Sequence, residues 1–135
     1  GEWQTVQEDL LPGYVFIDTD QPQEVCRALK RSGKRRMLFS CDDFISTLKE
    51  NERSFMESIT DQDGRIVLSK VSMAPDGEIS CLSGPLMHVS HLVRKMDLHR
   101  RIAEVETNFL GERHVLYLGI DIVGQASDWR QRTAV

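Results

Sequence analysis

Residues 84–101 read GPLMHVSHLVRKMDLHRR. The Gly-Pro pair that opens this stretch is typical of a tight turn, and the apolar residues after it predict a strand. The second half of the stretch places four basic side chains around the single acid Asp97; they are Arg94, Lys95, Arg100 and Arg101. The stretch therefore predicts a turn, a strand and a positively charged corner, in a chain whose net charge is -4.

Two further strands are predicted directly after this corner, over residues 101–109 and 114–123, with Gly111-Glu112 as the turn between them. Residues of a strand alternate between its two faces. One face of the first strand collects Ala103, Val105, Thr107 and Phe109, and one face of the second collects Leu116, Leu118, Ile120 and Ile122. Curling these strands around one another would leave few exposed edges, so we expect a small curled β-domain.

The composition indicates a globular protein of one ordinary domain or two very small ones. The chain has 135 residues, of which 40% are hydrophobic and 28% charged. Its longest apolar run, residues 115–120, is far too short to span a membrane, and no signal segment opens the sequence. Three widely separated cysteines do not suggest a disulfide framework, so we expect a cytoplasmic location. The negative net charge confines any nucleic-acid site to a local patch.

The first half of the chain predicts a mixture of strands and helices. Pro12-Gly13 favours a turn, and Tyr14–Ile17 after it predicts a buried strand. Residues 1–6 are also of β type. We expect a helix from a cap at Asp20 to Gly33, and a short strand over 36–40.

A second helix is predicted to follow a capping box at Thr47–Glu50. It would present Phe55, Met56 and Ile59 on one side and end at the Asp61–Gly64 turn. These elements together predict an α+β protein. Its expected divisions are a first domain over residues 1–72, a linker over 73–76, a β-barrel over 77–124 and a flexible tail over 125–135.

Several motifs resemble the NusG family of transcription elongation factors. Leu11-Pro12-Gly13-Tyr14-Val15-Phe16-Ile17 is similar to a strand of the family's N-terminal (NGN) domain. Ser83–Leu86, Lys95–Val105 and Leu118–Ile122 are similar to the family's KOW domain, most closely to the specialised LoaP-type antiterminators. The resemblance covers most of residues 3–123. It implies an antiparallel NGN-like sheet with helices, followed by a small KOW β-barrel.

The resemblance also implies partners and sites. An apolar patch would bind the clamp of RNA polymerase through Leu11, Pro12, Tyr14 and Phe16. The KOW domain would bind an RNA hairpin of a nascent leader, as in LoaP-like proteins, or a ribosomal protein or termination factor, as in ordinary NusG. The expected mechanism is tethering, in which one domain binds the polymerase and the other the RNA.

This chain departs from the family pattern in two places. The family's first domain normally begins with a strand and a helix that precede the region resembling Trp3 onward. The resemblance therefore implies a first domain without its first strand and helix, as in a fragment. The second departure is His88, which stands where the family usually has a turn glycine.

The RNA-binding prediction rests on cations that can neutralise phosphates. The predicted contacts are Arg94, Lys95, His99, Arg100, Arg101, His88 and His91. The competing interpretation is a solvated turn whose charges pair with Asp97, Glu104 and Glu106. A second basic run is a candidate contact for upstream DNA; its members are Lys30, Arg31, Lys34, Arg35 and Arg36. An ordinary solvated helix face explains that run equally simply.

Other classes of function have little support in the sequence. His88 and His91, with Cys81, invite a metal interpretation, but the spacing of further ligands does not fit a zinc site. No catalytic triad or phosphate-binding glycine loop is present, so we expect neither an enzyme nor a cofactor. The predicted protein is a monomeric, non-enzymatic regulator that does not bind membranes. An adaptor whose KOW strands pair with another protein is the alternative.

Overall fold

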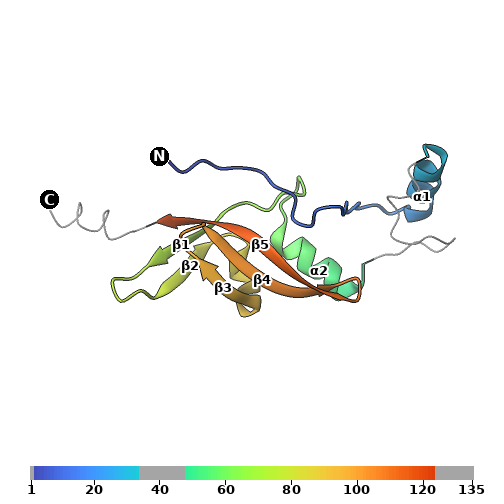
Figure 1. Cartoon of the computed structure of the whole chain (residues 1–135). Coiled ribbons are helices and arrows are strands. Elements are labelled where there is room, and N and C mark those ends of the chain that lie inside the picture. The colour runs from blue at the N-terminus through green and yellow to red at the C-terminus, as the bar shows by residue number, and fades with distance from the viewer. Residues whose placement is uncertain (1, 34–47, 124–135) are drawn as a thin grey trace. The chain divides into compact units, whose positions relative to one another are not determined.

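The computed structural model describes residues 2–33 and 48–123 of an α+β protein. The chain divides into two compact units, Gly1–Leu48 and Lys49–Val135, which are considered separately below (Figure 1). The predicted strand over 36–40, the predicted tail over 125–135 and the cations Lys34, Arg35 and Arg36 lie outside the described residues.

The first unit contains one helix in its described part, α1 (Pro22–Arg31), as the sequence predicted. The cap differs from the prediction, because Gln21 rather than Asp20 precedes the helix. The backbone N–H of Gln21 donates a hydrogen bond to Thr19 Oγ1 at 3.0 Å. Gly33 follows the helix with a φ of +77°, a conformation that suits glycine.

The Pro12-Gly13 turn is confirmed, but the buried strand predicted after it is wrong. The Tyr14 N–H donates to the Leu11 carbonyl at 3.0 Å, and Gly13 has a φ of +88°, which fits a type II turn. Residues 14–17 pair with no strand in the described part of the chain and are exposed; Val15 is 66% exposed. A strand needs a neighbour to bond with, and residues 2–6, predicted to be of β type, form none.

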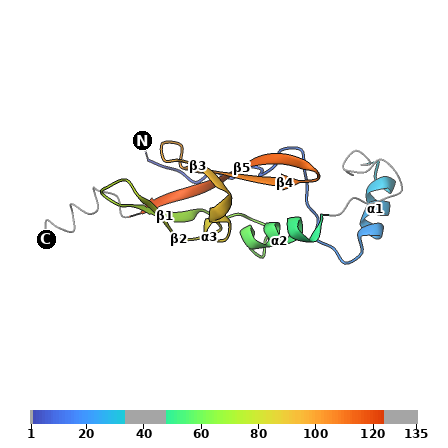
Figure 2. The same cartoon turned by 90° about the horizontal axis from the view of Figure 1, so that it is seen from below.

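The second unit is built on a mixed five-stranded sheet with helices against one side. Its elements are α2 (Glu50–Ile59), β1 (Ser69–Met73), β2 (Ile79–Ser83), α3 (Leu86–Val89), the short 3₁₀ helix η2 (Ser90–Leu92), β3 (Val93–Asp97), β4 (Ile102–Phe109) and β5 (Glu112–Val123). The strand order is β2-β1-β5-β4-β3, with β1 and β5 parallel and the other pairs antiparallel. Figure 2 shows α2 and α3 on the same side of the β4–β5 hairpin.

The core lies between this sheet and the helices, on the strand faces that the sequence predicted. Ala103, Val105 and Phe109 of β4 are fully buried. Leu116, Leu118 and Ile120 of β5 are buried beside them. The Phe55 ring of α2 contacts the Phe109 ring edge-on, with 5.3 Å between the ring centroids. The predicted helix face and both long strands are therefore confirmed.

The sheet is curled but open. Within the described residues β2 and β3 each pair with one strand only, so they form the two edges of a half-barrel rather than the predicted closed barrel. Such edges present backbone N–H and C=O groups to their surroundings.

The structure also places the division of the chain elsewhere than the sequence did. The predicted linker over 73–76 is the tight turn of the β1–β2 hairpin, in which the Ala74 N–H donates to the Glu78 carbonyl at 2.8 Å. β1 pairs with both β2 and β5, so a boundary at residue 72 would cut through the sheet. The Pro-Asp-Gly composition suits a hairpin turn as well as a linker, and the sequence pattern cannot distinguish the two.

Residues 86–92 form helical turns instead of the predicted strand. The Leu86 N–H donates to the hydroxyl of the buried Ser69 at 3.0 Å, and the Met87 N–H donates to the Gly84 carbonyl at 3.1 Å. Gly84 has a φ of +101°, and a Cβ there would lie 2.6 Å from the Ser69 Cα. Leu86 and Val89, three residues apart, bury the same side of α3.

Glu52 joins α2 to the tip of the β4–β5 hairpin. Its carboxylate accepts the Lys49 N–H at 2.9 Å and the Leu110 N–H at 2.6 Å, and the residue is 6% exposed. The bond to Lys49 lowers the pKa of Glu52 most, and the bond to Leu110 lowers it further, while burial opposes them. The capping carboxylate, Glu52, therefore lies two residues after Glu50, the carboxylate of the predicted box; Thr47 lies outside the described residues.

Candidate nucleic-acid interface

A β-bulge in β3 brings Arg94 and Lys95 to the same face of the sheet. Val93 lies opposite Val105, but Lys95 lies opposite Glu104, so β3 has one extra residue here. Arg94 Nε lies 3.6 Å from Glu104 Oε2, on the face away from the core. Without the bulge, alternation would direct these two adjacent side chains to opposite faces.

The corner between β3 and β4 is held by hydrogen bonds. The Arg100 N–H donates to Asp97 Oδ1 at 2.9 Å, and the Ile120 N–H of β5 donates to the Arg101 carbonyl at 3.0 Å. Arg101 has a φ of +59°, which turns the chain sharply into β4. The hydrogen bond from the Arg100 N–H lowers the pKa of Asp97 most; burial opposes it, and the nearby charges of Lys95 and Arg100 lower the pKa further. The side chains of His99 and Arg100 are exposed at this corner.

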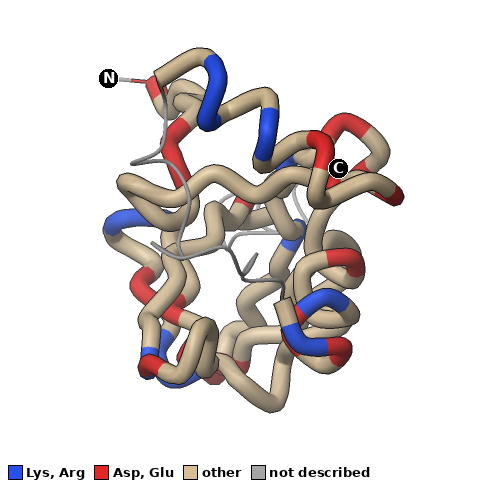
Figure 3. The backbone as a smooth tube through the Cα atoms, turned by 90° about the vertical axis from the view of Figure 1, so that its right-hand side faces the viewer, with Lys and Arg blue, Asp and Glu red and all other residues tan. Residues whose placement is uncertain are grey.

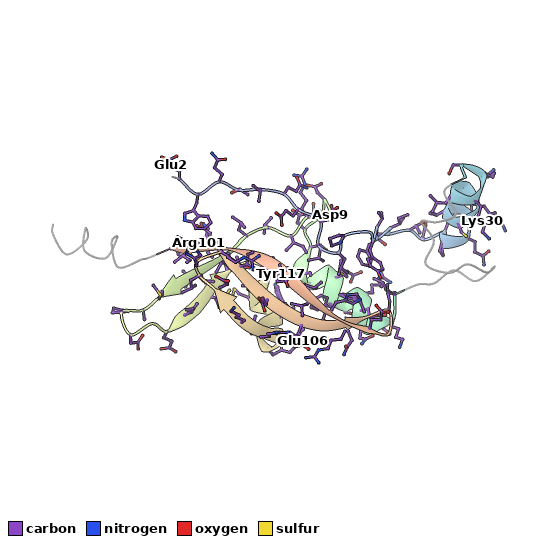
Figure 4. All side chains as sticks on the ribbon, in the orientation of Figure 1. Glu2, Asp9, Lys30, Arg101, Glu106 and Tyr117 are labelled. Atoms are coloured by element: carbon purple, nitrogen blue, oxygen red, sulfur yellow. The ribbon has the colours of Figure 1, made fainter. Side chains whose placement is uncertain are left out.

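Two arginines on the outer face of the sheet, Arg94 and Arg113, form salt bridges with glutamates of β4. Arg94 lies beside Glu104, and Arg113 of β5 pairs with Glu106 of β4. Figure 4 shows Glu106 and Tyr117 on these adjacent strands, with Arg101 at the start of the hairpin, and Figure 3 shows acidic and basic residues interspersed along the chain. Lys95 and Arg100 lower the pKa of Asp97 but form no salt bridge within the described residues. The local positive charge is thus concentrated at Lys95 and Arg100, with Arg101 beside them.

His88 and His91 lie apart from this corner. They line a groove of about 350 Å³ between α2 and the α3–η2 segment, and Thr107 near the end of β4 also lines it. The corner leads into the start of β4 at Ile102. Thr107 is five positions after Ile102 on β4, which corresponds to about 17 Å along the strand. The structure therefore divides the predicted RNA contacts into two groups.

The groove contains residues that the sequence analysis did not identify. Asn51, Ser54, Phe55 and Ser58 come from α2. Their i, i+3, i+4, i+7 spacing is a helical stripe that was visible in the sequence. Phe55 was expected only as part of the apolar helix face, and the other three members are polar, so an apolar stripe does not include them.

The predicted polymerase-binding residues lie in and after the turn of the first unit. Leu11 is buried and Pro12 is exposed. Tyr14 is 37% exposed and Phe16 is 36% exposed. Val15 and Ile17 between and beside them are more exposed still. An apolar segment is therefore accessible here, although it does not have the predicted strand structure.

The candidate DNA contacts are described only in part. Lys30 and Arg31 lie in the last turn of α1, where their charge also favours the helix C-terminus. In the described part of the chain, no group of three or more His, Cys, Asp and Glu side chains could hold a metal ion. No helix among residues 2–33 and 48–123 is long and apolar enough to cross a membrane.

Comparison with known proteins identifies no family. No protein-family model matches the chain, and no curated protein matches it either.

Proposed function

We propose that this chain regulates transcription by binding a nascent RNA hairpin through the corner of its second unit and RNA polymerase through its first unit. The observation that carries the proposal is the corner at residues 94–101. A bulge and a hydrogen-bonded turn direct Lys95 and Arg100 outward without a salt bridge among described residues. Cations displayed on a fixed turn suit the phosphates of a folded RNA, which proteins recognise largely by shape.

The second element of the proposal is the exposed apolar segment at residues 14–17. The resemblance of this segment to the NusG strand supports RNA polymerase as its partner. A regulator that binds both polymerase and RNA needs only modest affinity for each, because tethering raises the effective concentration of the second partner.

A titration of the full chain with a short RNA hairpin at several salt concentrations tests the proposal. Each phosphate contact contributes about 0.7–0.9 to the slope of log affinity against log salt. We expect Lys95→Ala combined with Arg100→Ala to weaken binding and to reduce the slope by about 1.5.

The matched control is Arg53→Ala combined with Arg65→Ala, which removes the same charge from α2 and the following loop. This control should leave both affinity and slope close to those of the unmodified protein. Binding that is absent or insensitive to salt, or that falls equally in both double variants, would refute RNA binding at the corner.

A protein-binding adaptor is the second candidate, and the open sheet favours it. The edge strands β2 and β3 offer unpaired backbone groups to an added strand, and Leu82 on β2 is half exposed. In that case a partner protein, rather than RNA, would protect the β2 and β3 amides from hydrogen exchange. RNA that protects the corner amides instead would count against this candidate.

A further inference from the structure

The groove between α2 and α3–η2 is lined by both apolar and polar side chains. Phe55, Val89 and Leu92 supply the apolar side chains. The polar members of the lining are Asn51, Ser54, Ser58, His88, His91 and Thr107. The groove lies wholly within the second unit, and its volume is about 350 Å³.

Most of these polar side chains have no hydrogen-bond partner among the described residues. Ser58 is the exception, because its hydroxyl donates to the Phe55 carbonyl at 2.7 Å. It thereby keeps its oxygen lone pairs for a ligand donor. The hydroxyl, amide and imidazole groups of the other five can both donate and accept hydrogen bonds. A ligand that has both kinds of group along its edge is therefore suited to the groove.

Among the described residues, no carboxylate, lysine or arginine contributes to the lining of the groove. Arg53 and Glu57 of α2 pair with each other outside the lining, with 2.9 Å between Arg53 Nε and Glu57 Oε1. Thr107 is paired across the sheet with His114, which lies 3.9 Å from Glu112. The described part of the lining therefore has no carboxylate that would repel a phosphate, and its two imidazole rings can donate hydrogen bonds to one.

We propose that this groove binds one unpaired nucleotide of the RNA. The inference rests on the proposed RNA-binding function and adds a second contact to it. A nucleobase has a flat apolar face, which suits Phe55, Leu92 and the imidazole rings, and a polar edge, which suits the amide and hydroxyl groups. The attached phosphate would lie near the histidines. The groove volume is sufficient for a single nucleotide, not for a paired stem.

The position of the groove fits a hairpin whose stem contacts the corner. Leu92 of the groove is only three positions before Lys95, but Thr107 of the groove lies about 17 Å along β4 from Ile102, which follows Arg101 at the corner. That separation corresponds to about five stacked base steps of a strand, at about 3.4 Å each. An unpaired loop or bulge nucleotide within about five steps of the phosphate that contacts the corner would therefore reach the groove.

The test uses the full chain and two RNAs with equal numbers of phosphates: a hairpin with an unpaired loop, and a blunt duplex that contains the same stem sequence and is longer by additional base pairs. Because a stacked base strengthens binding substantially, we expect the looped RNA to bind about tenfold more tightly. His88→Ala combined with His91→Ala should remove this advantage and leave duplex binding unchanged.

His99→Ala is the matched control, because it removes a histidine from the corner instead of the groove. It should affect both RNAs equally. Equal binding of the two RNAs to the unmodified protein, or an advantage that survives in the double variant, overturns the nucleotide site. If the corner variants still weaken duplex binding, RNA binding at the corner stands without the nucleotide site. If neither RNA binds the unmodified protein, the nucleotide site and the proposed RNA-binding function are both refuted.

A direct measurement covers the case in which the double variant is unstable. AMP or UMP at millimolar concentration should shift the NMR amide signals of Ser54 and Thr107 in the unmodified protein. Unchanged signals at both residues would overturn the nucleotide site, whatever the effect of the histidine substitutions.

Discussion

Replacing Glu52 with glutamine should destabilise the second unit strongly, although the two side chains have nearly the same shape. Both carboxylate oxygens of Glu52 accept backbone N–H groups, from Lys49 at 2.9 Å and from Leu110 at 2.6 Å. A glutamine can accept only one of these bonds, and its NH₂ group would face the other N–H donor. The substitution therefore removes one hydrogen bond, leaves a donor without an acceptor, and weakens the remaining bond by removing its charge.

The expected loss is about 2–4 kcal/mol, because hydrogen bonds to charged groups contribute about 1.5–3 kcal/mol and an unsatisfied buried donor costs about 1–3 kcal/mol. For a domain of this size, that corresponds to a decrease of about 10–25 °C in melting temperature. Thermal unfolding followed by circular dichroism measures the total effect. Hydrogen exchange at the Leu110 amide reports the local loss at the hairpin tip.

Glu57→Gln is the control, because Glu57 lies on the same helix but pairs with Arg53 at the surface. It should change stability by no more than about 0.5 kcal/mol. Since folding lowers the pKa of Glu52, its ionised form stabilises the fold above the ordinary pKa of 4.5 and loses this effect as the pH falls below it. The difference between the unmodified protein and Glu52→Gln should therefore shrink in acid. A loss no larger than that of Glu57→Gln, or a difference that is constant down to pH 3, would refute this account of Glu52.

Three further substitutions test the packing and the corner. Gly84→Ala should cost about 2–4 kcal/mol in chemical denaturation, because its Cβ would meet backbone at 2.6 Å, whereas Gly77→Ala has a similar φ in open space and should cost about 1 kcal/mol. Phe109→Ala should cost about 3–5 kcal/mol, since its side chain is fully buried, and Tyr117→Ala on the paired strand, 54% exposed, should cost far less; equal losses would contradict the assigned faces. Asp97→Ala should weaken RNA binding, because it releases the turn that orients the corner; tighter binding would mean that charge alone matters there.

The sequence predicted the elements that local pattern determines. Apolar alternation in residues 101–109 and 114–123 identified both long strands and their buried faces. The sequence pattern could not identify features that depend on pairing between segments distant in the chain. Tyr14–Ile17 has the composition of a strand, but no described segment pairs with it. The turn at 73–76 was interpreted as a linker, because only the pairing of β1 with β5 shows that the sheet continues through it.

The most consequential error concerned residues 86–92, because it merged two sites into one. A strand that led from Gly84 into the corner would have placed His88 and His91 on the same ribbon as Arg94 and Lys95. The hydrogen bond from the Leu86 N–H to the buried Ser69 instead begins a helical turn, which directs both histidines toward α2. Ser69 is seventeen positions earlier in the chain, so no local pattern could indicate this bond. The consequence is two chemically different surfaces: a corner with exposed lysine and arginine side chains, and a groove lined by apolar, hydroxyl, amide and imidazole groups. A ligand that reaches both must be charged along its length and carry a separate flat polar group, and an RNA hairpin with one unpaired nucleotide has both properties.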